Sequence, residues 1–174
     1  MRLTMLNQSK YALGTVARML EVARAEVGTV EGPKNNETKY GHFTNRNFLP
    51  WCGSFLMWCG HYAGVKLPNV VSTIDGAAHF KADMAWFDSP KVGDLVFYAW
   101  HDPKVIEHVG LVIRISSKQI VTIEGNTAGP GGSQSNGGEV MLKSRSIGAH
   151  SGIVGYGRPV YKAPTTAPIK GVTV

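Results

Sequence analysis

Cysteine is scarce in this sequence, and its scarcity excludes several classes of protein. The 174 residues contain two cysteines, Cys52 and Cys59, too few for a disulfide framework. If both lie on one helix, their Cα atoms are about 10 Å apart, too far for a disulfide bond. Adding His61 gives the spacing C-x6-C-x-H, which is poor for zinc because zinc ligands come in short pairs. We therefore expect no metal ion and no cofactor; a structural metal site made of Cys52, Cys59, His61 and His108 is the weaker alternative.

The chain also lacks a long uninterrupted apolar run. Residues 48–65 contain no Asp, Glu, Lys or Arg, but the run is interrupted by residues such as Pro50, Gly53, Ser54, Gly60 and His61. Too few consecutive apolar residues remain to cross a bilayer. Residues 1–10 contain no apolar segment that resembles a signal peptide. We expect a protein that is made in a cytoplasm and does not insert into membranes, so that action outside the cytoplasm requires another route of release.

Acidic residues are fewer than basic ones, and none follows Glu139. The chain has 18 Lys+Arg against 12 Asp+Glu, a formal net charge of +6. This excess suits an anionic partner such as nucleic acid or a cell wall that carries teichoic acid, although an ordinary solvated basic surface explains it equally well. No run of Arg and Lys interleaved with aromatic residues is present, so we do not expect a nucleic-acid-binding protein.

The length and the order of the patterns predict one α+β domain. Apolar residues from Leu13 to Val27 recur at helical spacing, with Ser9 as a possible N-cap and Gly28 as a stop. A polar loop, 28–47, leads to a second helix beginning near Pro50, and 73–86 has the pattern of a third. Strands are expected at 95–98, 108–115, 120–126, 140–142 and 153–161, which favours an antiparallel sheet. We assign 1–161 to a single, monomeric domain and 162–174 to a linker-like tail.

The uncharged segment WCGSFLMWCG predicts a buried helix that begins with a cysteine. Its apolar side chains lie all the way round the helix, and Pro50 is a residue favoured in a first turn. Cys52 would then lie where unpaired N–H groups and the helix dipole favour a thiolate over a thiol. Those N–H groups could also stabilise an oxyanion. The position is therefore suited to a nucleophile.

A hairpin supplies a candidate base for this cysteine. The large aliphatic residues of 108–115 and of 120–126 occupy odd positions, so the even positions of both strands share the other face. If 116–118 form an odd-length turn, His108 lies opposite Asn126 and diagonal to Glu124. A cysteine at a helix start and a histidine beside a carboxylate are the groups that thiol acyl transfer requires. For each residue alone, a buried structural role is the more common explanation.

Four motifs follow one another along the chain: WCGSFLMWCG, PKVGDLVFY, HVGLVI and TIEGN. In this order they resemble the signatures of the CHAP domain, a family of cysteine- and histidine-dependent amidohydrolases and peptidases, and the similarity extends over about 26–161. The segment EGPKNNETKYG also resembles the entry loop of CHAP domains in bacteriophage endolysins. The resemblance implies a papain-like fold and a catalytic group with Cys52 as nucleophile, His108 as base, Glu124 as its orienting partner and Asn126 as a fourth polar member.

The same resemblance implies a peptidoglycan hydrolase that cleaves an amide bond, either as an endopeptidase or as an N-acetylmuramoyl-L-alanine amidase. Such an enzyme would be made in the host cytoplasm and would act on the wall after its release. Trp51 and Trp100 are candidates to line a glycan or peptide groove. Trp51 stands where some phage CHAP domains have Gln, and the Asp-rich calcium loop of others is not evident here. The alternative from another class is a non-catalytic module whose groove binds peptidoglycan.

Overall fold

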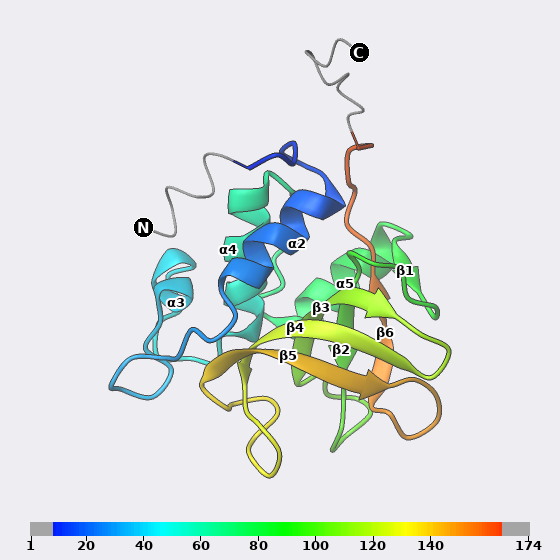
Figure 1. The fold of residues 1–174 in the computed structure, drawn as a ribbon. Coiled ribbons are helices and arrows are strands. Elements are labelled where there is room, and N and C mark those ends of the chain that lie inside the picture. The colour runs from blue at the N-terminus through cyan, green and yellow to red at the C-terminus, as the bar shows by residue number, and fades with distance from the viewer. Residues whose placement is uncertain (1–8, 165–174) are drawn as a thin grey trace.

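The computed structural model describes residues 9–164, which form helices packed against one antiparallel sheet (Figure 1). The helices are α2 (Val16–Ala25), α3 (Lys39–Phe43), α4 (Cys52–Ala63) and α5 (Thr73–Ala82). The strands are β1 (Trp86–Phe87), β2 (Leu95–Tyr98), β3 (His108–Ile115), β4 (Gln119–Thr127), β5 (Glu139–Ser146) and β6 (Ile153–Gly157). Every pairing in the sheet is antiparallel, in the order β1-β6-β2-β3-β4-β5. The predicted α+β class and papain-like, CHAP-type architecture are confirmed.

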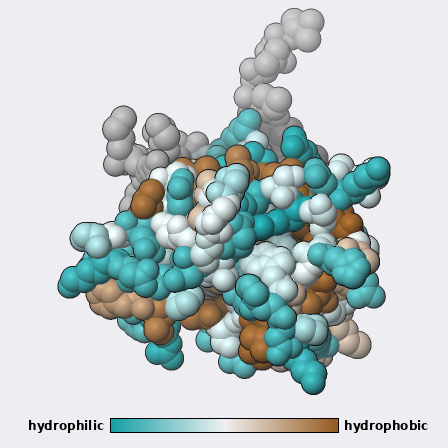
Figure 2. All heavy atoms as spheres, turned by 90° about the horizontal axis from the view of Figure 1, so that it is seen from below, coloured by the Kyte–Doolittle hydropathy of each residue, from teal (hydrophilic) through white to brown (hydrophobic). Residues whose placement is uncertain are grey.

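The main core lies between the helices and one face of the sheet. Helix α4 is its centre and contacts α2, α3, β3 and β4. Odd-numbered residues of the strands, such as Phe97, Leu111 and Ile123, belong to this core. A second, smaller cluster lies on the other face and contains Val96, Tyr98, Val112, Ile120 and Tyr156. On the face seen in Figure 2, hydrophilic residues prevail and hydrophobic ones form separate patches.

Several element boundaries differ from the predicted ones because of local backbone geometry. Helix α2 begins after Thr15, whose hydroxyl caps Arg18 N–H, and not at Ser9, because Gly14 has a φ of 89° and ends any preceding helical turn. Helix α5 ends at Ala82, since Met84 has a φ of 54°, and Trp86 lies in a strand. Pro50 precedes the N-cap of α4 instead of lying in its first turn.

The other differences concern the polar loop and the last strands. Residues 28–47 include helix α3, whose N-cap Thr38 accepts a hydrogen bond from Gly41 N–H. Strand β5 is longer than predicted, and β6 is shorter because Pro159 has no N–H to donate to a ladder. Of the predicted tail, Lys162 donates a backbone hydrogen bond to Gly14, whereas 165–174 lie outside the described residues. No helix within 9–164 combines the length and the apolar character that a membrane span needs.

Candidate active site

The β3–β4 hairpin brings His108 and Glu124 together on one face of the sheet. Leu111 pairs with Ile123, and Val112 with Thr122, which is the predicted register. His108 Nε2 lies 3.1 Å from Glu124 Oε2, and both side chains are fully buried. Gly110 makes room for this contact, because a Cβ atom there would lie 2.7 Å from Glu124 Cγ. The predicted grouping of histidine and carboxylate is therefore present.

The turn of this hairpin differs from the predicted one. Ser116 N–H donates to Gln119 O, which closes a two-residue turn, and Arg114 pairs with Val121. The pairing shifts by one residue between Val112 and Arg114, which is a β-bulge. The bulge compensates for the even-length turn and restores the predicted register near the site.

Asn126 does not lie opposite His108, because the β3–β4 pairs end at Leu111–Ile123. Its φ is 59°, in a region where β4 is irregular, and its side chain is turned toward the Gly/Ser-rich loop 128–138. There Nδ2 donates to Ser135 O and Asn136 Oδ1, and Oδ1 accepts from Gly138 N–H. The structure therefore brings Asn126 to the base of this loop and not to the imidazole.

Cys52 is the first residue of α4, as predicted, and its side chain is almost completely enclosed, with 3% exposed. The helix start is held close to the segment that follows α4. A Cβ atom at Gly53 would lie 2.0 Å from Val70 O, so only glycine allows the two backbones to approach this closely. The first N–H groups of a helix have no acceptor within the helix, and here the N–H of Gly53 forms a hydrogen bond with the Cys52 thiol.

The thiol of Cys52 and the imidazole of His108 form a coupled pair. Burial raises the pKa of Cys52, but the charge and hydrogen bond of His108 and the N–H groups of Val109 and Gly53 outweigh burial and lower it below its ordinary value. Burial lowers the pKa of His108, but Cys52 and Glu124 outweigh it and raise this pKa to about 9. Both effects favour a thiolate–imidazolium ion pair at neutral pH.

The orientation of the imidazole follows from its hydrogen bonds. Nε2 faces Glu124. Burial alone would raise the pKa of this carboxyl group. Hydrogen bonds and charges of His108 and Arg145 reverse that effect and lower the pKa of Glu124, so it is an ionised acceptor. Nε2 must then carry a proton, and Nδ1 is the nitrogen left for Cys52. Apart from the thiol, Nδ1 has no hydrogen-bond partner in the described part of the chain.

Glu124 is held by more donors than His108 alone. The hydroxyl groups of Tyr98 and Thr122 donate to Oε1 at 3.2 and 2.6 Å, and Arg145 Nε donates to the same atom at 3.0 Å. Arg145 Nη2 also donates to Oε2. A buried carboxylate with this many donors keeps its charge and its orientation.

Arg145, like Tyr98 and Thr122, contacts Glu124 but was not identified as a site residue from the sequence. It projects from β5, lies over the rings of Tyr98 and Trp100 at 5.4 and 5.1 Å, and donates to Gln134 in the 128–138 loop at 3.0 Å. Its strand was predicted to end at Leu142, so no pattern in the sequence connected Arg145 with Glu124. Arg145 lies three positions after the predicted end of the strand, and the residues around it do not indicate a contact with Glu124.

The two tryptophans proposed for a substrate groove have different positions. Trp51 is fully buried, stacked on Tyr40 at 5.3 Å, and donates to Glu31. It cannot line a groove, and that prediction is wrong: the N-cap residue of α4 is turned into the core. Trp100 is partly exposed and stacks on His108 with ring centroids 5.6 Å apart. It therefore lies beside His108, and part of its surface is open to solvent.

The structural metal site considered as an alternative is not formed. Within residues 9–164, no three side chains of His, Cys, Asp or Glu approach closely enough to hold a metal ion. Cys59 is free and fully buried in the core, and His61 is exposed and packs against Phe43 and Tyr62. The two cysteines thus lie in separate environments, and the proposed set of four ligands is wrong.

Comparison with known proteins adds an independent observation to this geometry. Residues 44–126 match the family model of the CHAP domain. The matched segment runs from the loop before α4 to the end of β4 and contains Cys52, His108 and Glu124. CHAP domains are typically cysteine- and histidine-dependent amidohydrolases or peptidases that act on peptidoglycan, which agrees with the site described above. A search of curated proteins found no match to this chain.

Proposed function

We propose that this chain is a cysteine peptidase or amidase that hydrolyses an amide bond of bacterial peptidoglycan. The observation that supports this most directly is the continuous series Cys52–His108–Glu124. In it, a thiol at a helix start faces an imidazole whose other nitrogen is bound to an ionised, buried carboxylate. This is the arrangement that activates a nucleophile by an adjacent base. The bond cut is either a peptide bond of the stem or cross-bridge, or the bond between muramic acid and alanine.

The reaction proceeds through a thioester in two halves. The Cys52 thiolate attacks the carbonyl carbon, and N–H groups of the first turn of α4 stabilise the oxyanion. His108 gives its proton to the leaving nitrogen, the C–N bond breaks, and an amine departs. A water molecule then attacks the thioester while His108 accepts its proton. The C–S bond breaks, the carboxylic acid is released, and the thiolate–imidazolium pair is restored.

The other polar residues hold this pair in position. In our proposal, Glu124 fixes the tautomer of His108 and stabilises the imidazolium, and Arg145 fixes Glu124. Asn126 does not touch the imidazole; it holds the 128–138 loop in place through hydrogen bonds. Gln134 of that loop in turn accepts a hydrogen bond from Arg145. Trp100, which stacks on His108, is the remaining candidate for contact with the substrate.

The biological setting is an expectation that rests on the resemblance of residues 31–41 to the entry loop of phage endolysins. We propose a bacteriophage lysin that acts as a monomer, is made in the host cytoplasm and reaches the wall after release. The net charge of +6 supports attraction to an anionic wall. The expected partner is peptidoglycan alone, with no nucleic acid and no insertion into the membrane.

Analysis of released fragments by mass spectrometry tests the proposed reaction. Gram-positive peptidoglycan is incubated with the wild type and with the Cys52→Ala variant. New amine and carboxyl ends are expected with the wild type only, and their masses identify the bond. Tight binding to the wall without any new ends would instead favour the non-catalytic binding module.

A further inference from the structure

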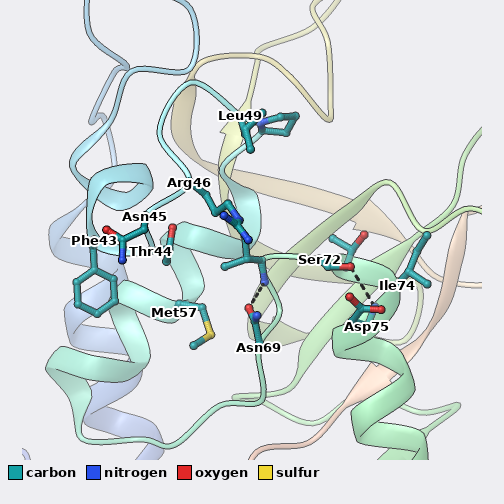
Figure 3. A pocket seen from close by; sticks show the side chains of 13 residues that line it. Phe43, Thr44, Asn45, Arg46, Leu49, Met57, Asn69, Ser72, Ile74 and Asp75 are labelled. Atoms are coloured by element: carbon teal, nitrogen blue, oxygen red, sulfur yellow. Dashed lines mark hydrogen bonds between the residues drawn. The ribbon is translucent and has the colours of Figure 1, made fainter.

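A cavity beside the start of α4 has the properties of a site for the peptide of the substrate. It measures about 910 Å³ and lies between residues 43–50 on one side and 69–75 on the other, with Met57 of α4 at its base (Figure 3). The volume is within the range of small-molecule sites, roughly 300–1,000 Å³. Cys52 and His108 do not line the cavity themselves.

Each wall of this cavity is connected to one residue of the proposed catalytic pair. Pro50 lines one wall and precedes Cys52 by two positions. Thr73 lines the other wall, and its hydroxyl donates at 2.5 Å to the carbonyl oxygen of Ile106, two positions before His108. A chain that lies in the cavity can therefore extend from it toward the nucleophile.

The lining of the cavity combines apolar residues and neutral polar residues with one unpaired charge on each side. Phe43, Leu49 and Ile74 are 40%, 50% and 52% exposed, which is high for large apolar side chains. Arg46 is exposed and forms no ion pair within the described residues, and in Figure 3 its side chain extends between the two walls. Asp75, on the opposite wall, likewise has a carboxylate without an ion-pair partner in 9–164. Unpaired charges beside exposed apolar side chains are suited to a ligand that has both kinds of group.

We propose that this cavity binds the stem peptide of peptidoglycan and that Arg46 pairs with a carboxylate of that peptide. A guanidinium group matches a carboxylate through two parallel hydrogen bonds. The apolar part of the lining suits the short side chains of alanine-rich peptides, and its amide and hydroxyl groups can form hydrogen bonds with a peptide backbone. This inference depends on the proposed function for its choice of peptide, but the binding site itself can be tested separately.

Calorimetric titration of the inactive Cys52→Ala protein tests the site without cleavage. The probes are a synthetic stem peptide with a free C-terminal carboxylate and the same peptide as its amide. The acid should bind roughly tenfold to a hundredfold more tightly, the usual effect of hydrogen bonds between charged groups. Adding Arg46→Ala should remove this difference, and Arg46→Lys should restore part of it. Equal binding of acid and amide by the protein with Arg46 intact would overturn the inference.

Arg114→Ala is the matched control, because Arg114 is also exposed but lies on β3, outside the cavity lining. It removes the same charge and should keep the preference for the acid. Inorganic phosphate is the competing anion: displacement of the peptide by phosphate at equal concentration would show a phosphate site and contradict the peptide assignment.

The two proposals fail in different ways. If the wild type cleaves peptidoglycan but the preference for the acid is absent, the cavity assignment is wrong and the hydrolase stands. If the acid binds through Arg46 but no wall bond is cut, the cavity assignment stands and the hydrolase is wrong. In the active enzyme, Arg46→Ala should raise KM for wall fragments and leave kcat nearly unchanged.

Discussion

The two cysteines of α4 show how position on one helix decides the chemistry of a side chain. Both are free and buried, and they are separated by seven positions. Cys52 begins the helix and faces His108, and its pKa is lowered despite its burial. At Cys59 burial raises the pKa, the charge of Glu26 raises it further, and Lys39 only partly opposes this. The difference teaches that burial inactivates a thiol unless a cation and N–H groups face the sulfur atom.

The largest expected effect comes from replacing each cysteine by alanine. Cys52→Ala should lower kcat on peptidoglycan by about 10⁴-fold or more, because no other group can form the thioester. Cys59→Ala should retain most of the activity and instead lower the free energy of unfolding by about 1 kcal/mol through lost packing. Turnover and chemical denaturation of both variants are the measurements. Substantial activity in Cys52→Ala would show that Cys52 is not the nucleophile.

Glu124→Gln should have the next largest effect. Each oxygen of Glu124 accepts hydrogen bonds from two or more residues, so the NH₂ of a glutamine must face donors whichever way it points. We expect kcat to fall by about 10²–10⁴-fold, as when the orienting carboxylate of a triad becomes an amide. The free energy of unfolding should fall by about 3 kcal/mol, because the partly buried Arg145 loses its counterion.

Acid unfolding provides a second measurement on the same variant. The folded pKa of Glu124 is about 2, below its ordinary value of 4.5. Its contribution to stability is therefore present above about pH 4.5 and is lost as the pH falls toward 2. Glu124→Gln should lose less stability than the wild type across that window. An identical acid dependence would show that Glu124 is not an ionised acceptor in the folded protein.

Arg145 and Arg158 allow a comparison between a site residue and a structural residue. Arg158 binds the buried Asp94 through two hydrogen bonds, much as Arg145 binds Glu124, but the other contacts of its guanidinium group are with Ser89 and Phe87 and not with the proposed catalytic residues. Either change to alanine should destabilise the fold, because a buried carboxylate loses its partner. Only Arg145→Ala should shift the acid limb of kcat/KM to higher pH, since the pKa of Glu124 rises. Arg145→Lys should restore part of the wild-type pH profile of kcat/KM. If the two alanine variants have the same pH profile, Arg145 does not act on the site through Glu124.

The periodicity of the chain predicted much of this site. The alternation of 108–115 and 120–126 grouped His108 with Glu124, because neighbouring side chains of a strand must point to opposite faces. The uncharged run after Pro50 predicted a buried helix with Cys52 in its first turn. These features depend on local geometry and on the period of each element, which can be read from a single sequence.

The features that were missed depend on contacts between distant segments. Arg145 reaches Glu124 across β4 and β5, and Trp51 enters the core because Tyr40 provides a stacking partner. The bulge near Ile113 compensates for a turn of unpredicted length. The cavity at Arg46 forms only when 43–50 and 69–75 fold beside each other. None of these contacts leaves a periodic pattern in the sequence.

Brief alkylation with iodoacetamide at mildly acidic pH, followed by peptide mapping, tests the central claim most directly. The folded wild type should be labelled rapidly at Cys52 and hardly at all at Cys59, because only Cys52 is held as a thiolate by His108. His108→Ala should slow the labelling of Cys52 and move its onset to alkaline pH. If Cys59 is labelled first, if both are labelled equally, or if His108→Ala leaves the rate at Cys52 unchanged, Cys52 is not the activated nucleophile.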